Sequence, residues 1–156
     1  MIWFTIHVKM VIDMRLLMEL LTLVLGKYWE NYGVHAVEAC FPLLGNGFEW
    51  VQNLGTLERP MMHLHHRSGC DVSIPMGTAF VSNGVTVMAQ YGAQALSDGD
   101  SYYCFKKQLD VFVEYLRTGI RDHSFEDAVE IAKIVIAGIK SREEGGRRVY
   151  VDEVRS

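Results

Sequence analysis

The stretch Tyr28-Trp-Glu-Asn-Tyr-Gly-Val-His-Ala-Val-Glu38 places a histidine shortly after a glycine, at the start of an apolar run that ends near Leu44. We expect residues 34–44 to form a helix that follows a turn at Gly33, with Pro42 bending its last turn. A histidine at a helix N-terminus can act as a general acid or base toward a substrate hydroxyl or carbonyl. The same pattern also fits a histidine that is only hydrogen-bonded at a half-buried helix end.

The composition is that of an ordinary globular domain. The 156 residues are 49% hydrophobic and 22% charged, which allows one domain with its own core. The net charge of −4, without a basic stripe, argues against a nucleic-acid partner. Cys40, Cys70 and Cys104 form no C-x-x-C motif. We therefore expect buried thiols, no disulfide framework and a reducing, cytoplasmic location.

Residues 1–26 are strongly apolar but carry four charges, at Lys9, Asp13, Arg15 and Glu19. These charges leave no uncharged run long enough for a membrane span, and no signal-peptide cleavage site is evident. Alternation over residues 4–10 predicts a strand, and the leucine-rich run after Asp13 predicts a helix that stops at Gly26. The sequence thus predicts an atypical strand and helix, 1–26, joined to a domain, 27–156, in one compact unit.

The remainder of the chain predicts an antiparallel meander followed by two helices and a last strand. Runs rich in strand-forming residues occupy 48–54, 60–67, 71–74, 78–82 and 85–91, and Asn83-Gly84 predicts a tight hairpin between the last two. Apolar periodicity predicts a helix over 101–118, with Phe105, Leu109, Phe112, Val113 and Leu116 on one stripe, and a second helix over 124–142 that Ser124 caps. Residues 147–154 predict the last strand. A mostly antiparallel sheet covered by helices is an α+β fold.

A histidine cluster invites a metal. His63 and His65 alternate along a predicted strand, so both point to one face of it. No Asp or Glu lies in the run from these histidines to Cys70 that would complete a site. We expect surface histidines here and no metal.

Two glycine-containing motifs have residues typical of ligand sites. Asp98-Gly-Asp100 suits a turn and a helix cap better than a calcium loop, because Tyr102 and Cys104 occupy the later ligand positions. Gly45-Asn-Gly47 lacks a third glycine and follows a predicted helix, so it is not a dinucleotide fingerprint. We expect no cofactor to bind this chain by itself.

The histidine segment resembles a known family. Tyr32-Gly-Val-His35-Ala-Val-Glu38-Ala, followed by Leu43-Leu44-Gly45, resembles the C-terminal domain of the Gfo/Idh/MocA oxidoreductases, and so do the segments 108–119, 125–138 and 141–149. The resemblance covers roughly residues 27–154. It implies a large, open, mixed sheet with helices on one face, whose other face commonly mediates dimers or tetramers.

The resemblance also implies roles for individual residues. In intact members a preceding Rossmann domain binds NAD(P) and supplies a lysine, which works with a D-x-x-x-H motif of the C-terminal domain. His35 matches the histidine of that motif, whereas Asn31 stands at the aspartate position and cannot take a proton. Asn31 can still orient a substrate hydroxyl, and Tyr32 and Glu38 are predicted to bind substrate. No Rossmann half and no Glu-Lys-Pro motif is recognisable in the sequence.

Three hypotheses follow. The first is a truncated or stand-alone substrate and oligomerisation domain, which binds a sugar or polyol around His35 and has no dehydrogenase activity by itself. The second is a non-enzymatic dimerisation or small-ligand-binding module. The third is an enzyme half completed in trans by a separate Rossmann chain. As partners we expect a second copy, in a homodimer or larger homo-oligomer through the open sheet face, and neither nucleic acid nor membrane.

Overall fold

The computed structural model describes residues 18–21, 29–57, 59–76, 84–97 and 100–155. Seven strands in these ranges form one sheet, in the order β6-β5-β1-β4-β3-β2-β7. The strands are β1 (Met18–Leu21), β2 (Phe48–Asn53), β3 (Met61–His66), β4 (Asp71–Pro75), β5 (Gly84–Ala89), β6 (Gly92–Ser97) and β7 (Val149–Tyr150). β1 and β4 run parallel, and the other described pairs run antiparallel. The predicted open, mostly antiparallel mixed sheet is confirmed.

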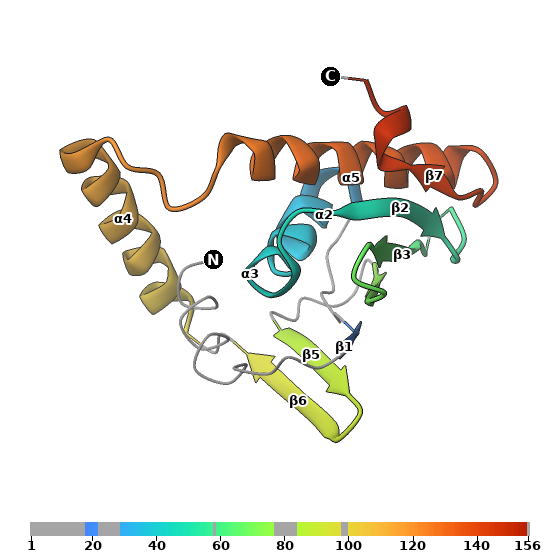
Figure 1. Ribbon diagram of the computed structural model, residues 1–156, viewed down its shortest axis with the longest axis horizontal. Helices are drawn as coiled ribbons and strands as arrows, with labels where there is room; N and C mark the ends of the chain where they lie inside the picture. The colour runs from blue at the N-terminus through green and yellow to red at the C-terminus, as the bar shows by residue number, and fades with distance from the viewer. Residues whose placement is uncertain (1–17, 22–28, 58, 77–83, 98–99, 156) are drawn as a thin grey trace.

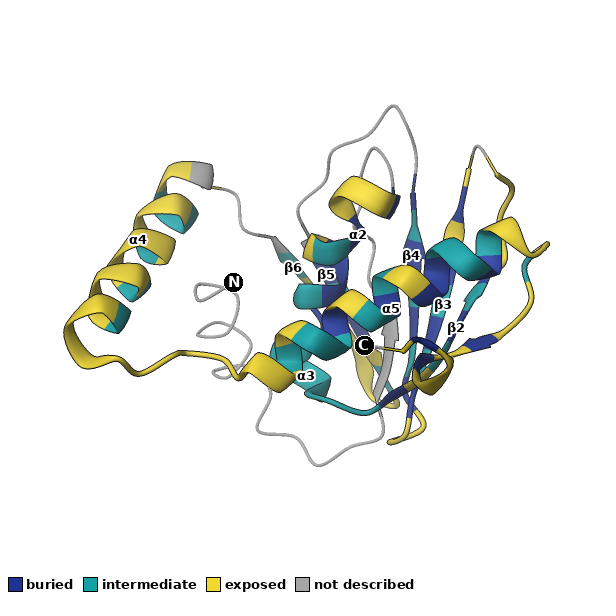
Figure 2. Cartoon of the chain, turned by 90° about the horizontal axis from the view of Figure 1, so that it is seen from above, coloured by how far each residue is buried: buried dark blue, intermediate teal, exposed yellow. Residues whose placement is uncertain are grey.

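Helices α5 and α2 cover one face of this sheet. The helices are α2 (Trp29–Glu38), the short α3 (Phe41–Leu44), α4 (Ser101–Thr118) and α5 (Phe125–Glu143), and the 3-10 turn η1 (Val151–Glu153) follows β7. α5 lies along the sheet with α2 beside it, whereas α4 projects to one side (Figure 1). The view from above shows the buried residues between α5, α2 and the strands (Figure 2). The predicted α+β class is therefore correct.

The core forms where alternate strand positions meet these two helices. Strands β2, β3, β4 and β5 each turn two or more apolar side chains toward the helices, and the opposite positions stay half-buried or exposed. This alternation follows from the two-residue repeat of a strand. The buried apolar side chains of these elements include Val51, Met62, Leu64, Val72, Ile74, Val85 and Val87 from the strands, and Ala36, Val37, Ile131, Ile134 and Ala137 from the helices.

The predicted helix ends of the C-terminal half are confirmed. The Ser124 hydroxyl accepts a hydrogen bond from the Asp127 amide at 3.0 Å, and the Asp127 carboxylate accepts one from the Ser124 amide at 3.1 Å. This reciprocal pair fixes the start of α5. Asp100 caps α4 by accepting from the Tyr103 amide at 3.0 Å. Gly119 ends α4 with a φ of 70°, a conformation that glycine adopts without strain.

The predicted helix after Asp13 is wrong at residues 18–21. These residues form β1, which lies between β4 and β5 inside the sheet. At four residues, this run is too short for its hydrophobic period to separate a strand from a buried helix. The predicted strand over 4–10 and the stop at Gly26 lie outside the described residues. The division of the chain at residue 26 stays a prediction.

The helix predicted over 34–44 has different bounds. α2 begins five residues earlier, at Trp29, and α3 is a separate turn that starts at Phe41, just before Pro42. Gly33 is therefore an interior residue of α2 and not a turn before it. Its place is explained by packing, because a Cβ on Gly33 would lie 2.8 Å from the Trp29 ring.

Two strand predictions also change. The run predicted as 85–91 is β5, which pairs with β6 through a two-residue connection at Gln90 and Tyr91. β6 (Gly92–Ser97) was not predicted, because its run Gly-Ala-Gln-Ala-Leu-Ser has few strand-forming residues. The last strand is only Val149–Tyr150 before η1 begins. The predicted strand 78–82 and Asn83 of the predicted hairpin lie outside the described residues.

The apolar stripe of α4 does not pack on the sheet. Its members Phe105, Leu109, Phe112, Val113 and Leu116 are exposed. The periodicity correctly predicted a helix, but periodicity does not say what covers the apolar side. No helix within the described ranges is both long and apolar enough to cross a membrane.

Candidate active site

A cavity of about 530 Å³ lies between α2, α4 and the segment that joins α4 to α5. It gathers polar and aromatic side chains from three places that are far apart in the sequence. α2 contributes His35 and Glu38 to its lining. The remaining lining residues are Gln108, Val111, Phe112 and Tyr115 of α4, and Arg121, Asp122 and His123 of the joining segment. Such a concave site with a few convergent polar groups is typical of small-molecule binding.

His35 and Glu38 form a pair on the cavity wall. The Nδ1 atom of His35 lies 3.4 Å from Oε2 of Glu38, and 67% of the His35 side chain is exposed. The two residues are three apart on α2, so they lie on neighbouring turns of one side. His35 stands in the last turn of α2. The expectation that His35 projects from a helix N-terminus is therefore wrong. The neighbouring group that can orient the His35 ring is the Glu38 carboxylate.

Trp29 explains why α2 presents this side to the cavity. Trp29 is fully buried, and its indole N–H donates a 2.8 Å hydrogen bond to the carbonyl of Val135 on α5. Its ring lies between two glycines, since added Cβ atoms would come within 2.8 Å of it at Gly33 and 2.5 Å at Gly138. α2 is thereby held against α5 by its buried side, and the side that bears His35 faces outward.

The other two residues predicted for the site lie on its margin. Tyr32 is 48% exposed, and its ring centroid is 6.4 Å from that of His35. Asn31 is exposed one turn before His35 and is not among the residues that line the cavity. Both positions adjoin the imidazole, but a direct role of either in the cavity stays a prediction.

Sequence reasoning missed the residues that face His35 from the other wall. His123 and Asp122 form a second histidine–carboxylate pair, with Nδ1 2.6 Å from Oδ1. Arg121 lies with its guanidinium 5.8 Å from the ring centroid of Tyr115. These residues follow the stop at Gly119, in a segment without periodicity. No sequence signal links them to His35, because only the approach of α4 to α2 brings them together.

The glycine segment 45–47 does not fit the phosphates of a nucleotide. It leads from helix α3 into strand β2, the reverse of the strand-to-helix order that cradles a pyrophosphate. The amides of Gly47 and Phe48 already donate to the Glu130 carboxylate, at 2.7 and 2.9 Å. A carboxylate at this place repels phosphate. The residues present therefore do not fit a nicotinamide cofactor at this segment.

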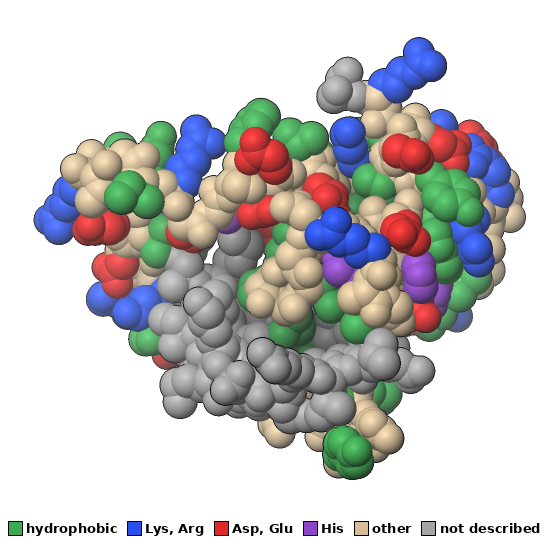
Figure 3. Space-filling model, viewed as in Figure 1, with side chains coloured by type: hydrophobic (Ala, Val, Ile, Leu, Met, Phe, Trp, Pro, Cys, Tyr) green, Lys and Arg blue, Asp and Glu red, His purple; other side chains and the backbone are tan. Residues whose placement is uncertain are grey.

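The histidine cluster on the open sheet face has the acidic neighbour that the sequence run lacked. Asp71 comes from β4, and its Oδ1 lies 3.3 Å from His63 Nε2 and 2.7 Å from His65 Nδ1. Trp50 stacks on His65 with ring centroids 5.1 Å apart, and the Arg148 guanidinium lies 3.8 Å from the centroid of the Trp50 ring. Some histidine side chains reach the surface in the space-filling view (Figure 3). Over the described ranges, no group of three metal-ligating side chains is arranged to hold an ion. The prediction that this face pairs two copies stays a prediction.

Solved structures share this fold over most of the chain. The chain matches a probable dehydrogenase from Thermotoga maritima with a TM-score of 0.73 and 16% identity, over 98% of this chain and 61% of that one. The described residues thus share the fold of the C-terminal domain of Gfo/Idh/MocA-type dehydrogenases. A myo-inositol dehydrogenase from Corynebacterium glutamicum matches with a TM-score of 0.70 and 13% identity, over 94% of this chain and 60% of that one. An oxidoreductase from Agrobacterium radiobacter, solved with NAD+, L-tartaric acid and magnesium, matches with a TM-score of 0.60 and 12% identity, over 87% and 56%.

The chain therefore spans about three fifths of the length of these Gfo/Idh/MocA-type structures. At least one protein of this fold binds NAD+. The likeness shows the fold and does not by itself assign an activity. No protein-family model and no curated protein matches the sequence.

Proposed function

We propose that this chain is a substrate-binding domain related to NAD(P)-dependent sugar or polyol oxidoreductases, and that it holds a sugar or polyol in the cavity beside His35. One observation supports this most directly. The histidine that the family resemblance identifies lines a cavity of about 530 Å³ together with further hydrogen-bonding side chains. A polyol presents several hydroxyls, which require several donors and acceptors at fixed positions.

The residues divide the work by their chemistry. The His35 imidazole can accept a proton from a substrate hydroxyl while the Glu38 carboxylate holds the ring in place. On the facing wall, Gln108 and Arg121 donate hydrogen bonds, and the apolar surfaces of Phe112 and Tyr115 suit the C–H faces of a sugar ring. Hydride transfer belongs to a nicotinamide cofactor. We propose that the chain by itself has no dehydrogenase activity.

Calorimetric titration with myo-inositol and with glucose tests this proposal. We expect weak binding of one of the two, and we expect His35→Ala to weaken it about tenfold, the effect of losing one hydrogen bond of about 1.5 kcal/mol. His65→Ala is the matched control, because His65 lies on the open sheet face and should leave binding unchanged. Equal loss in both variants, or no binding of either compound, contradicts the assignment of the cavity.

A second titration addresses the cofactor. NADH and NADPH are added to the chain alone, and their nicotinamide fluorescence is followed. We expect no change, because the amides of Gly47 and Phe48 are already bound to Glu130. Tight binding of either nucleotide overturns the proposal that this chain holds no cofactor by itself.

A further inference from the structure

The outer side of α4 carries a continuous apolar row. Tyr102, Phe105, Leu109, Phe112 and Leu116 follow one another at alternating spacings of three and four residues. Their exposed fractions are 80%, 65%, 51%, 55% and 66%. This spacing is the a/d repeat by which one helix packs against another. We call these five residues the α4 seam.

The α4 seam borders the side of α4 that faces the rest of the chain, and Phe112, at the border, also lines the cavity. Gln108, Val111 and Tyr115 line the cavity toward α2 and occupy the neighbouring side of the helix. Beyond the other edge of the seam lie charged residues, among them the ion pair of Lys106 and Asp110 at 3.0 Å. In the space-filling view, hydrophobic and charged side chains lie next to each other on this helix (Figure 3). An exposed apolar row with charged residues along one edge is typical of a surface that binds another protein.

We propose that the α4 seam pairs with the α4 seam of a second copy of this chain, in antiparallel orientation. The order of the side chains supports this occupant, because the seam is nearly symmetric about Leu109. In a twofold pair Leu109 meets Leu109 of the second copy, Phe105 meets Phe112, and Tyr102 meets Leu116. A twofold interface requires this reciprocity, in which residue i contacts j while j contacts i.

Charge selects the antiparallel orientation over the parallel one. In a parallel pair the flank that bears Lys106 faces Ser101 and Gln108 of the second copy, which offer it no opposite charge. In the antiparallel pair Lys106 of one copy lies next to Asp110 of the other. The ion pair already present within each helix then extends into a network across the interface.

This inference goes beyond the proposed polyol site, with which the α4 seam shares only Phe112. The open sheet face remains a separate surface, where Trp50 is already stacked between Arg148 and His65. The α4 seam and the open sheet face share no residue, so a variant can change one of the two surfaces without changing the other. Pairing through α4 favours the dimerisation module among the hypotheses drawn from the sequence.

Size-exclusion chromatography with light scattering on the full chain is the first test. We expect a dimer that becomes a monomer in Leu109→Glu, because two carboxylates meet at the twofold axis. Leu57→Glu is the matched control, since Leu57 is 64% exposed but lies far from α4 in the sequence. We expect this variant to remain dimeric. A monomeric parent chain, or a Leu109→Glu variant that stays dimeric, overturns the proposal.

Cysteine crosslinking tests the orientation and stays informative if a charge variant folds poorly. Tyr102→Cys and Leu116→Cys chains are oxidised separately and as a mixture, with the parent chain showing the background from its native cysteines. The antiparallel pair predicts an efficient crosslink in the mixture and little in either variant alone. A crosslink in each variant alone, or none in the mixture, overturns the antiparallel pairing.

Discussion

Two glycines and one tryptophan fix the position of the helix that bears His35. Gly33 and Gly138 let the helices α2 and α5 approach the Trp29 ring from two sides. We predict that Gly138→Ala destabilises the fold by about 1–3 kcal/mol, because the added methyl group would lie 2.5 Å from the Trp29 indole nitrogen. The loss is expected despite the higher helix propensity of alanine. Denaturant unfolding of the two chains measures it.

A double-mutant cycle separates this clash from any other effect of the alanine. In a Trp29→Leu background the obstructing ring is gone, so Gly138→Ala should cost much less than in the parent chain. If Gly138→Ala lowers the free energy of unfolding equally in both backgrounds, the added methyl group does not clash with Trp29.

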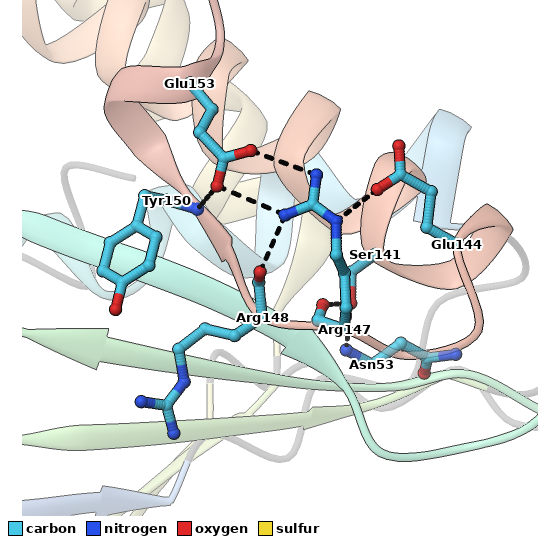
Figure 4. Close-up of polar contacts among 7 residues, drawn as sticks. All are labelled: Asn53, Ser141, Glu144, Arg147, Arg148, Tyr150 and Glu153. Carbon is cyan, nitrogen blue, oxygen red and sulfur yellow. Dashed lines mark hydrogen bonds and ion pairs between the residues drawn. The ribbon is translucent and has the colours of Figure 1, made fainter.

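Ser141 joins the end of α5 to the sheet through a buried hydroxyl. Its Oγ accepts a hydrogen bond from the Asn53 amide at 2.8 Å and donates one to the Arg147 carbonyl at 2.5 Å (Figure 4). We predict that Ser141→Ala lowers the free energy of unfolding by about 1–3 kcal/mol, because the buried Asn53 amide loses its acceptor. Thermal unfolding of this variant is compared with that of Ser124→Ala, which loses an exposed cap and should cost about 1 kcal/mol.

Individual site residues could be predicted only where they share a local segment. His35 and Glu38 are three residues apart on one helix, and their adjacency follows from helix geometry alone. Asp71, by contrast, approaches His63 and His65 through the register of β3 with β4, in which His65 pairs with Asp71. Asp122 and His123 line the cavity because the segment between α4 and α5 passes beside it. Contacts between residues so far apart in the sequence cannot be predicted from residue spacing.

At the scale of whole elements, α2 and α5 are connected by a partly buried ion pair. The Glu30 carboxylate on α2 accepts a hydrogen bond from the Arg142 guanidinium on α5, which lowers the pKa of Glu30. A carboxyl whose pKa is lowered by folding stabilises the fold above its unfolded pKa of about 4.5 and loses that contribution as the pH falls toward its folded pKa.

We therefore predict that Glu30→Gln is less stable than the parent chain at neutral pH and that the difference shrinks below pH 4.5. Because water reaches part of the Glu30 carboxylate, the difference at pH 7 should be about 0.5–1 kcal/mol. Urea unfolding at a series of pH values measures both chains. A difference that is constant from pH 7 to about pH 3 contradicts a role of the Glu30 charge.

The elements that were predicted well are those with strong local signals. α5 has a reciprocal Ser124–Asp127 cap, and the helix over 101–118 ends at a left-handed glycine, so both were placed nearly to the residue. β1 was mistaken for a helix because its four residues are too few to show a two-residue repeat. The start of α2 was predicted five residues too late, because Gly33 was interpreted as a turn. The sequence alone does not show that Gly33 packs against the Trp29 ring.

At the scale of the whole molecule, the helix α4 stands away from the sheet, so its stability as a helix depends on what it meets (Figure 2). An exposed helix of 18 residues is marginal in water, because most helical stability in proteins comes from packing of the apolar side. α5 has its apolar side in the core, with Ile134 and Ala137 fully buried. The two helices should therefore respond differently to the concentration of the protein.

We predict that amide hydrogen exchange in α4 slows as the protein concentration rises, whereas exchange in α5 does not change. Pairing of two α4 seams opposes the opening of α4 in proportion to the population of the dimer, and α5 is already protected by the core. The measurement is exchange mass spectrometry on the full chain across a hundredfold range of concentration, with Leu109→Glu as the control whose α4 exchanges quickly throughout. If α4 of the parent chain exchanges at the same rate at every concentration, the α4 seam does not pair with a second copy.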